Sequence, residues 1–476
     1  MLGNVIALCA CASDASGDAG GRGGDRLCER NSWVRPASNP GRVGGGSGRQ
    51  PVWYGRVIGS LVVFSISYLV IASRQLRFLG LDRPAGATVG AVAMVVVGGL
   101  PMDAALRAID LQVMTLLFGI LLISAYLTEA GLFRQCAYLV LTRARSARSL
   151  LFALTFIAGA LSALLLNDTV CVLLTPLVVA VALEARLPVL PYLLALASAA
   201  NVGGVVSFSG NPQNMIIGAA AHGAPSFAQY LLLTLPVGVA CLAANAAALA
   251  WLFRRQLPAG PLAHHAPPRP ALDRRLAVKA VAALAGFAAL ALAGVSLAGA
   301  AMVAAAGLVL IARTPPSRTF AAVDWQLLVF FAGLFVLVAG VAHAGLLDRM
   351  FDALAPVIGR GDAMGDLAFV ALVVAGSNLI SNVPLVVVAV AWVPRMPDPA
   401  WGYVMLAVAS TLAGNLTLFG SVANVIVMEA AGPHGDVGFW RFLRYGVVLT
   451  AVDLGVGFGL LAAERWLGVA GWLGIA

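Results

Sequence analysis

The sequence predicts an all-α integral membrane protein with about ten transmembrane helices and two re-entrant hairpins, arranged as two inverted repeats. The prediction comes from the composition, from a series of apolar segments and from motifs that recur in the second half. Hydrophobic residues make up 61% of the 476 residues and charged residues 11%, whereas soluble domains hold about 25% charged residues. So few polar residues cannot coat a soluble fold, which excludes a cytosolic enzyme, a secreted disulfide scaffold and a disordered hub.

The formal net charge of +9 comes almost wholly from arginine, since Lys279 is the only lysine. The arginines lie in short loops between apolar segments, as topology signals do, rather than in the cluster that a nucleic-acid site needs. We therefore expect no nucleic-acid partner. The cysteines have no metal-ligand spacing, and we expect no disulfide framework; they are Cys9, Cys11, Cys28, Cys136, Cys171 and Cys241.

Residues 1–53 differ from the rest because they are rich in Gly, Ser, Asp and Arg. Such a composition cannot bury a core. No basic residue precedes the weakly apolar stretch at 2–12, which argues against a signal peptide. We expect 1–53 to be a disordered or non-native tail.

The remaining chain divides into two series of apolar segments, separated by a cytoplasmic linker at 256–274 that holds His264-His265 and Pro267-Pro268. The first repeat is predicted at 54–255 and the second at 275–476. Each full span has about the 20 residues that a crossing helix needs. The first series lies near 57–73, 86–101, 111–130, 150–184, 190–220 and 228–253, and the second near 276–294, 297–312, 325–345, 366–395, 400–430 and 438–463.

An ordered series of matches relates the two halves. Asp110-Leu111-Gln112 recurs as Asp324-Trp325-Gln326. The same offset takes Gly119 to Gly333 and Asn201 to Asn415, and a slightly smaller one takes Gly210 and Asn214 to Gly420 and Asn424. One segment in each half, 150–184 or 366–395, is interrupted and returns to the same side, which leaves five full spans per half. Because this number is odd, the halves should be inverted in the membrane. Arginine is concentrated in alternate loops, which places the main basic loops in the cytoplasm and the protein in a bacterial-type inner membrane.

Two apolar segments, 150–184 and 366–395, are interrupted by polar residues at their middle, and we predict that each forms a re-entrant hairpin. The first tip is Asn167-Asp168-Thr169, and the second is Ser377-Asn378 with Ser381-Asn382-Val383-Pro384. Backbone at such a tip cannot face lipid, so it must be buried or line a wet cavity. An ionisable group such as Asp168 at this depth usually marks an ion or substrate route, although it could instead cap a helix N-terminus.

Two further segments, 190–220 and 400–430, are broken by glycine, proline and amide residues. Paired breaks at corresponding positions of two inverted halves are the best sequence pointer to a transport site. The alternatives are kinks without a ligand, or amides that only join helices. The candidate substrate- and ion-binding residues are Asn167, Asp168, Thr169, Asn201, Gly210, Asn211, Asn214, Ser381, Asn382, Asn415, Thr417, Gly420, Ser421 and Asn424.

Other polar residues are weaker candidates. His343, Glu129 and Asp453 are interpreted as interfacial residues near span ends, and Glu429 as a weaker candidate for the cavity. Nucleotide, dinucleotide, metal and catalytic-triad motifs are not found, so we expect no catalytic residue, no cofactor and no metal beyond a transported Na⁺. A membrane enzyme or structural scaffold would remain an alternative if two catalytic groups converged within the membrane.

At these motifs the sequence resembles the ion transporter superfamily, in particular its bacterial anion transporter branch, which is citrate-transporter-like. The likeness spans about 55–465. It rests on Leu165-Leu166-Asn167-Asp168-Thr169-Val170 with Leu174-Thr175-Pro176, on Gly210-Asn211-Pro212-Gln213-Asn214, and on Gly414-Asn415-Leu416-Thr417 with Gly420-Ser421.

The resemblance implies a scaffold domain, a moving transport domain with elevator-type motion, and a homodimer. In the related sodium/dicarboxylate symporters, Ser-Asn-Thr at both tips binds carboxylates and sodium. Both Asn positions carry over here, as Asn167 and Asn382, whereas the first Ser and both Thr do not. Asp168 would repel a dianion unless it were protonated or paired with a cation.

These observations predict a secondary active transporter in the lipid bilayer for a small inorganic or carboxylate anion, coupled to Na⁺ or H⁺. The alternative is a Na⁺/H⁺ antiporter or arsenite efflux permease of the same superfamily.

Overall fold

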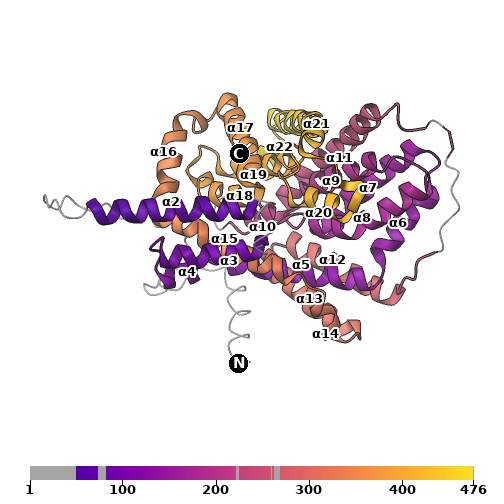
Figure 1. The fold of residues 1–476 in the computed structure, drawn as a ribbon, viewed down its shortest axis with the longest axis horizontal. Helices are drawn as coiled ribbons and strands as arrows, with labels where there is room; N and C mark the ends of the chain where they lie inside the picture. The colour runs from indigo at the N-terminus through magenta and orange to yellow at the C-terminus, as the bar shows by residue number, and fades with distance from the viewer. Residues whose placement is uncertain (1–49, 73–81, 221–223, 259, 262–268, 475–476) are drawn as a thin grey trace. The chain divides into compact units, whose positions relative to one another are not determined.

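The computed structural model describes residues 50–72, 82–220, 224–258, 260–261 and 269–474. Within these ranges every extended regular element is a helix (Figure 1). The first group comprises α2 (Gln50–Ala72), α3 (Arg83–Val96), α4 (Met102–Ala108), α5 (Leu111–Glu129), α6 (Leu132–Arg143), α7 (Ala147–Leu164), α8 (Asn167–Glu184), α9 (Val189–Gly204), α10 (Pro212–Gly218) and α11 (Phe227–Leu252).

The second group follows the same order. It comprises α12 (Arg274–Leu292), α13 (Leu297–Ala312), α14 (Pro316–Ala321), α15 (Trp325–His343), α16 (Leu346–Ile358), α17 (Ala363–Ile380), α18 (Asn382–Ala389), the 3-10 turn η3 (Val393–Arg395), α19 (Pro399–Ala413), α20 (Val422–Ala430), the 3-10 turn η4 (Gly432–Gly435), α21 (Phe439–Trp466) and the short α22 (Val469–Trp472).

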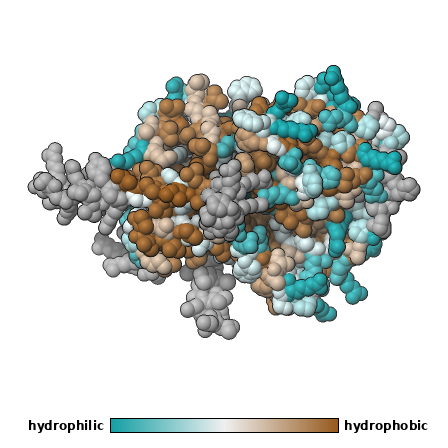
Figure 2. Space-filling model, viewed as in Figure 1, coloured by the Kyte–Doolittle hydropathy of each residue, from teal (hydrophilic) through white to brown (hydrophobic). Residues whose placement is uncertain are grey.

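The helices have the length and composition of membrane helices. Eight of those described are long and apolar enough to cross a bilayer, and shorter apolar helices accompany them. Apolar side chains cover much of the face in Figure 2, while polar ones gather toward its margins. Only lipid can solvate so much exposed apolar surface, so the predicted all-α membrane fold is confirmed.

Polar side chains at the helix starts explain where many helices begin. Asp110 accepts from the backbone N–H groups of Gln112 and Val113 at the start of α5, and Asp324 accepts from Leu327 at the start of α15. Such caps satisfy amides that have no partner within the helix.

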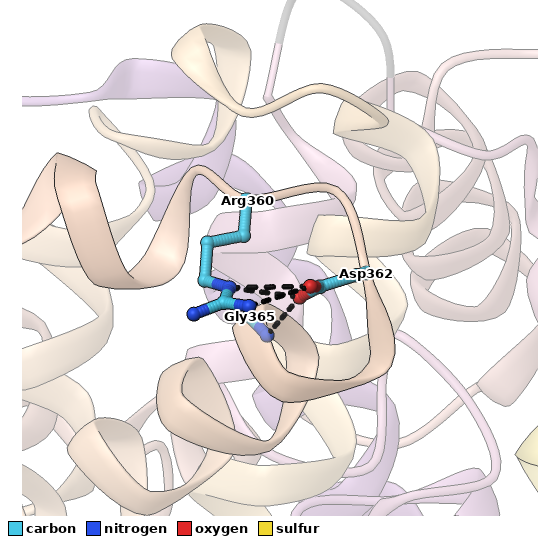
Figure 3. A network of polar contacts seen from close by, with 3 residues as sticks. All are labelled: Arg360, Asp362 and Gly365. Carbon is cyan, nitrogen blue, oxygen red and sulfur yellow. Dashed lines mark hydrogen bonds and ion pairs between the residues drawn. The ribbon is translucent and has the colours of Figure 1, made fainter.

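The cap of α17 carries an ion pair as well (Figure 3). Asp362 accepts from the Gly365 N–H at 2.8 Å and from Arg360 Nη2 at 2.9 Å. The bond from Arg360, with help from the Gly365 N–H, lowers the pKa of Asp362.

All four predicted interruptions are present. Leu165 and Leu166 lie between α7 and α8, and Ser381 lies between α17 and α18. The breaks between α9 and α10 and between α19 and α20 cover 205–211 and 414–421. Polar, glycine- and proline-bearing sequence therefore ends the helices where expected.

Two helices fall in or beside stretches that were not predicted as helical. The Arg-bearing stretch 131–149 forms α6, and α16 occupies the corresponding place before the second hairpin. Each begins at a glycine in the left-handed region, Gly131 (φ 82°) and Gly345 (φ 70°). Glycine adopts this conformation without steric cost, so the chain can turn sharply into a new helix.

Some predictions concern residues outside the described ranges. Residues 1–49 of the predicted tail, the linker segment 262–268 and the cysteines Cys9, Cys11 and Cys28 are among them. Residues 50–53 belong to α2. Cys136, Cys171 and Cys241 are free thiols.

Long helices of the two groups pack reciprocally. Helix α5 packs against α13, and α15 packs against α3. A Cβ on Gly119 would lie 2.8 Å from the Ala301 Cβ, and one on Gly333 would lie 2.8 Å from the Ala87 carbonyl oxygen. Both contacts therefore need glycine, because the facing backbone leaves no room for a side chain.

Candidate functional site

The four interruptions are brought together by packing between the two groups of helices. The second arm of the first hairpin, α8, packs against α20, while α10 packs against α18 and α19. Helices α9 and α19 also contact each other. Segments that are far apart in sequence thus share one buried region.

At its centre lies Asn201, whose amide group uses its full hydrogen-bonding capacity. Its Nδ2 donates to Asn415 Oδ1 at 2.9 Å and to Asn424 Oδ1 at 3.2 Å. Its Oδ1 accepts from Asn167 Nδ2 at 3.2 Å and from Ser421 Oγ at 2.9 Å. All five side chains are buried. We call them the amide cluster: Asn167, Asn201, Asn415, Ser421 and Asn424.

Two asparagines close the ends of the broken helices. Asn214 Nδ2 donates to the Gly204 carbonyl at 2.8 Å, and Asn424 Nδ2 donates to the Gly414 carbonyl at 2.7 Å. These carbonyls lie where α9 and α19 end, beyond the last intrahelical bonds, and the Gly204 carbonyl also accepts from Asn211 Nδ2 at 3.2 Å. Side-chain amides thus replace the missing helical turn on both sides.

The start of α10 is organised by Asn211 and Thr411. Asn211 Oδ1 accepts from the Asn214 N–H at 2.8 Å, and its Nδ2 donates to Thr411 Oγ1 at 3.1 Å. Thr411, on α19, also accepts from Gln213 Nε2 at 3.4 Å. Sequence reasoning did not select Thr411, since a threonine within an apolar helix commonly bonds only to its own helix.

The first hairpin tip is tied to this region through its backbone and through Asn167. The Asn167 N–H donates to the Gly210 carbonyl at 3.0 Å, and its Oδ1 accepts from the Asp168 N–H at 2.9 Å. Asp168 and Thr169 are only partly buried, and neither side chain makes a hydrogen bond to another described residue. Asp168 thus adjoins the amide cluster without entering it.

The second tip is arranged differently. Ser381 has a φ of 71°, and Asn382 Oδ1 accepts from the Val383 N–H at 2.9 Å. The bonds to the broken helix come from Asn378, one turn earlier: its Nδ2 donates to the Ala413 carbonyl at 3.0 Å, and its Oδ1 accepts from Thr417 Oγ1 at 2.9 Å.

Gly420 lies against this second tip. A Cβ there would come within 2.6 Å of Asn378 Oδ1. A side chain at position 420 would therefore displace the Asn378 amide. Asn378 was predicted as part of the second tip, although it was not among the candidate binding residues.

Asp453 corrects a sequence interpretation. It was interpreted as interfacial, but it lies in the middle of α21 and is fully buried. Its Oδ2 accepts from Asn245 Nδ2 at 2.9 Å and from Asn415 Nδ2 at 3.0 Å, which connects it to the amide cluster. The signal was available, because residue 453 stands well inside the predicted span 438–463. Glu429, the weaker cavity candidate, is exposed at the end of α20.

The arrangement offers many neutral amide and hydroxyl groups, freed backbone at two broken helices and one fully buried carboxylate. Within the described residues, groups of three or more His, Cys, Asp or Glu that could hold a metal ion are not found. Neutral dipoles of this kind can bind an anion through N–H groups or a dehydrated cation through oxygens.

The known proteins that this chain resembles include several named as transporters. The family model described as "Citrate transporter" matches residues 68–405. The silicon efflux transporter LSI3 of Oryza sativa subsp. japonica is 30% identical over 475 residues, covering 85% of this chain and 98% of that protein. A transporter named arsB from Dictyostelium discoideum is 24% identical over 526 residues, covering 83% of this chain and 90% of that protein.

Among solved structures, the YdaH transporter of Alcanivorax borkumensis matches with a TM-score of 0.51 and 16% identity. The match covers 87% of this chain and 98% of that chain. At this identity the likeness concerns the fold.

Proposed function

The chain belongs to the citrate transporter family and is a multi-pass membrane transporter; from this premise we propose that it is a secondary active transporter for a small inorganic or carboxylate anion. The proposed driving force is a Na⁺ or H⁺ gradient across the inner membrane. The sequence motifs give no nucleotide site from which the energy could come.

The observation that carries the proposal is the amide cluster. Its five polar side chains are buried where four interrupted helical segments meet. Polar groups deep in an apolar bundle are costly unless they are satisfied, and in membrane proteins they usually mark a route for ions or substrates. In this proposal the cluster, the two tips and the breaks at Gly210 and Gly420 form the substrate site, and Asp168 is a candidate for binding the coupling cation.

The proposed architecture is two inverted repeats, 54–255 and 275–476, that exchange conformations in an elevator-type motion. Reciprocal packing supports this: Gly119 lies against Ala301 as Gly333 lies against Ala87, and the sequence offset that takes Gly119 to Gly333 also takes Ala87 to Ala301. The caps of the broken helices match as well, because Asn214 donates to the Gly204 carbonyl as Asn424 donates to the Gly414 carbonyl. The arginine distribution supports cytoplasmic placement of the main basic loops, and the family resemblance supports a homodimer.

A second candidate is efflux of an uncharged or weakly charged oxyacid. Two relatives are named for silicon efflux and as arsB. Each side chain of the amide cluster is neutral, with paired donors and acceptors that suit a hydroxylated species. For the alternative function, a Na⁺/H⁺ antiporter, neither the relatives' names nor the amide cluster gives similar support.

Counterflow in proteoliposomes tests the proposal. Proteoliposomes that contain the full-length protein would be loaded with unlabelled citrate, phosphate, arsenite or silicic acid. The same compound in labelled form would then be added outside. We expect transient accumulation with at least one probe, and its loss in Asn201→Leu. Ser60→Ala is a matched control, because Ser60 is a buried serine whose hydroxyl bonds to the Gly98 carbonyl outside the cluster. Cation exchange without counterflow of any probe would contradict the proposal and favour the antiporter.

A further inference from the structure

We propose that Asp453 is the proton-binding group of the transport cycle and that its protonation is coupled to the substrate site through Asn415. This inference rests on the proposed function and names its coupling ion as H⁺. It starts from the position of Asp453, which no part of the transport proposal above uses.

Asp453 is remote from water and from charge along its own helix. Arg444 lies about 13 Å away toward one end of α21, and Glu464 about 16 Å toward the other, from the rise of an α-helix. Arg441 and Arg465 lie farther still.

The neighbouring helices supply no counter-ion. Helices α11, α19 and α22 pack against α21, and α9 packs against α11 and α19. None of these helices contains Asp, Glu, Lys, Arg or His. Their titratable groups are the phenols Tyr192, Tyr230 and Tyr403 and the thiol of Cys241, whose Sγ donates to the Asp453 main-chain carbonyl at 3.3 Å.

The carboxyl group itself is unevenly satisfied. Oδ2 accepts two amide hydrogen bonds, whereas Oδ1 is buried without a hydrogen-bond partner. An ionised carboxylate that lacks a counter-ion in an apolar interior is strongly disfavoured, and protonation removes its charge. Oδ1, the oxygen without a hydrogen-bond partner, is therefore the atom that would bind the proton.

A dehydrated metal cation would need several oxygens at once. The side-chain oxygens of the two neighbouring amides are already engaged. Asn245 Oδ1 accepts from Ser198 Oγ at 2.8 Å, and Asn415 Oδ1 accepts from Asn201. The geometry therefore favours H⁺ over Na⁺ at this residue.

A chain of amides connects Asp453 to the first hairpin tip. Asn415 donates to Asp453 and accepts from Asn201, which in turn accepts from Asn167. When Asp453 is ionised, its charge-assisted bond fixes the orientation of the Asn415 amide. Protonation weakens that bond and frees Asn415 to turn, so proton binding and substrate binding must influence each other reciprocally.

The test uses the full-length protein in proteoliposomes, with the probe that gives counterflow in the wild type. With one proton per substrate, a pH gradient of one unit supports about tenfold accumulation. We expect Asp453→Asn to lose this gradient-driven accumulation, while counterflow, which needs no net proton movement, falls far less. Glu129→Gln, at a partly buried carboxylate that ends α5 and accepts from Thr319 outside the proposed site, is the matched control and should retain pH-driven accumulation.

A milder variant guards against misfolding. Asn245→Ala removes one of the two donors to Asp453 and should move the pH midpoint of driven transport upward, because the ionised form loses stabilisation. Accumulation by Asp453→Asn at the wild-type level, or an unshifted midpoint in Asn245→Ala, would overturn the inference. If the wild type itself gives no counterflow, the proposed function fails instead.

Discussion

The two hairpins differ in how firmly they are held. The first, α7 and α8, packs against α9 at a close backbone approach, where a Cβ on Gly203 would collide with the carbonyl oxygen of Gly159. At the matched positions of the proposed repeat, the second hairpin and α19 carry Val374 and Ala413, whose side chains hold the backbones farther apart.

Polar contacts differ in the same direction. Ser162 on α7 donates to the Ala200 carbonyl, whereas the matched Ser377 on α17 is buried with no hydrogen-bond partner. The first tip reaches Asn201 through Asn167, while the second holds Ser381 at a φ that non-glycine residues rarely adopt. We infer that equivalent motifs can give one fixed hairpin and one more easily opened, and that the second is the better candidate for a gate.

The largest expected effect tests the close approach. Gly203→Ala should destabilise the protein by about 2–3 kcal/mol through overpacking, measured as thermal or denaturant unfolding in detergent. Its matched control, Ala413→Gly, should cost only about 1 kcal/mol, the helix-propensity difference. Equal effects at the two positions would remove the basis of the comparison.

Hydrogen exchange measures the difference without a mutation. Amides of 363–389 should exchange about tenfold faster than those of 147–184, which corresponds to an opening cost lower by about 1.4 kcal/mol. Peptide-resolved mass spectrometry in lipid nanodiscs would show this. Slower exchange in the second hairpin would reverse the assignment of the gate.

The paired serines give a smaller effect. Ser162→Ala should cost about 1 kcal/mol because it removes a buried hydrogen bond, whereas Ser377→Ala should be neutral or slightly stabilising because its hydroxyl is unpaired. Unfolding midpoints of the two variants measured side by side would decide, and a loss at Ser377 as large as at Ser162 would show that its hydroxyl has a partner.

The smallest expected effect concerns pH at the hairpin starts. The bonds from Arg360 and Gly365 lower the pKa of Asp362. Its stabilising contribution is therefore present above about pH 4, the unfolded value, and is lost as the pH falls through the lower folded value. The first hairpin begins instead with a Ser146–Ser149 capping box that does not titrate. Exchange near 362–366 should therefore rise between pH 4 and 3 in the wild type but not in Asp362→Asn, and identical profiles would contradict the role of the ion pair.

Sequence reasoning located what depends on local chemistry. Helix breaks at Asn167, Gly210 and Asn382 follow from polar and glycine residues in apolar runs, and the repeat matched Asn214 with Asn424, which cap the two broken helices alike. Thr411 was missed because only tertiary packing turns it toward a neighbouring helix. Asn378 was placed in the second tip, but its bonds to the broken helix could not be predicted from the sequence. Asp453 was misplaced because a lone carboxylate in a span was assigned to the interface, although its partners come from α11 and the end of α19.

The reciprocal glycine contacts have a consequence for how the chain could be divided. Because α5 lies against α13 and α15 against α3, neither half can cover its own apolar helices when alone. If the chain were divided at the linker, we would expect the two fragments to fold stably only when both are produced in the same cell. Under the proposed inversion, a half-length ancestor would have needed a second, oppositely inserted copy to cover the same helices.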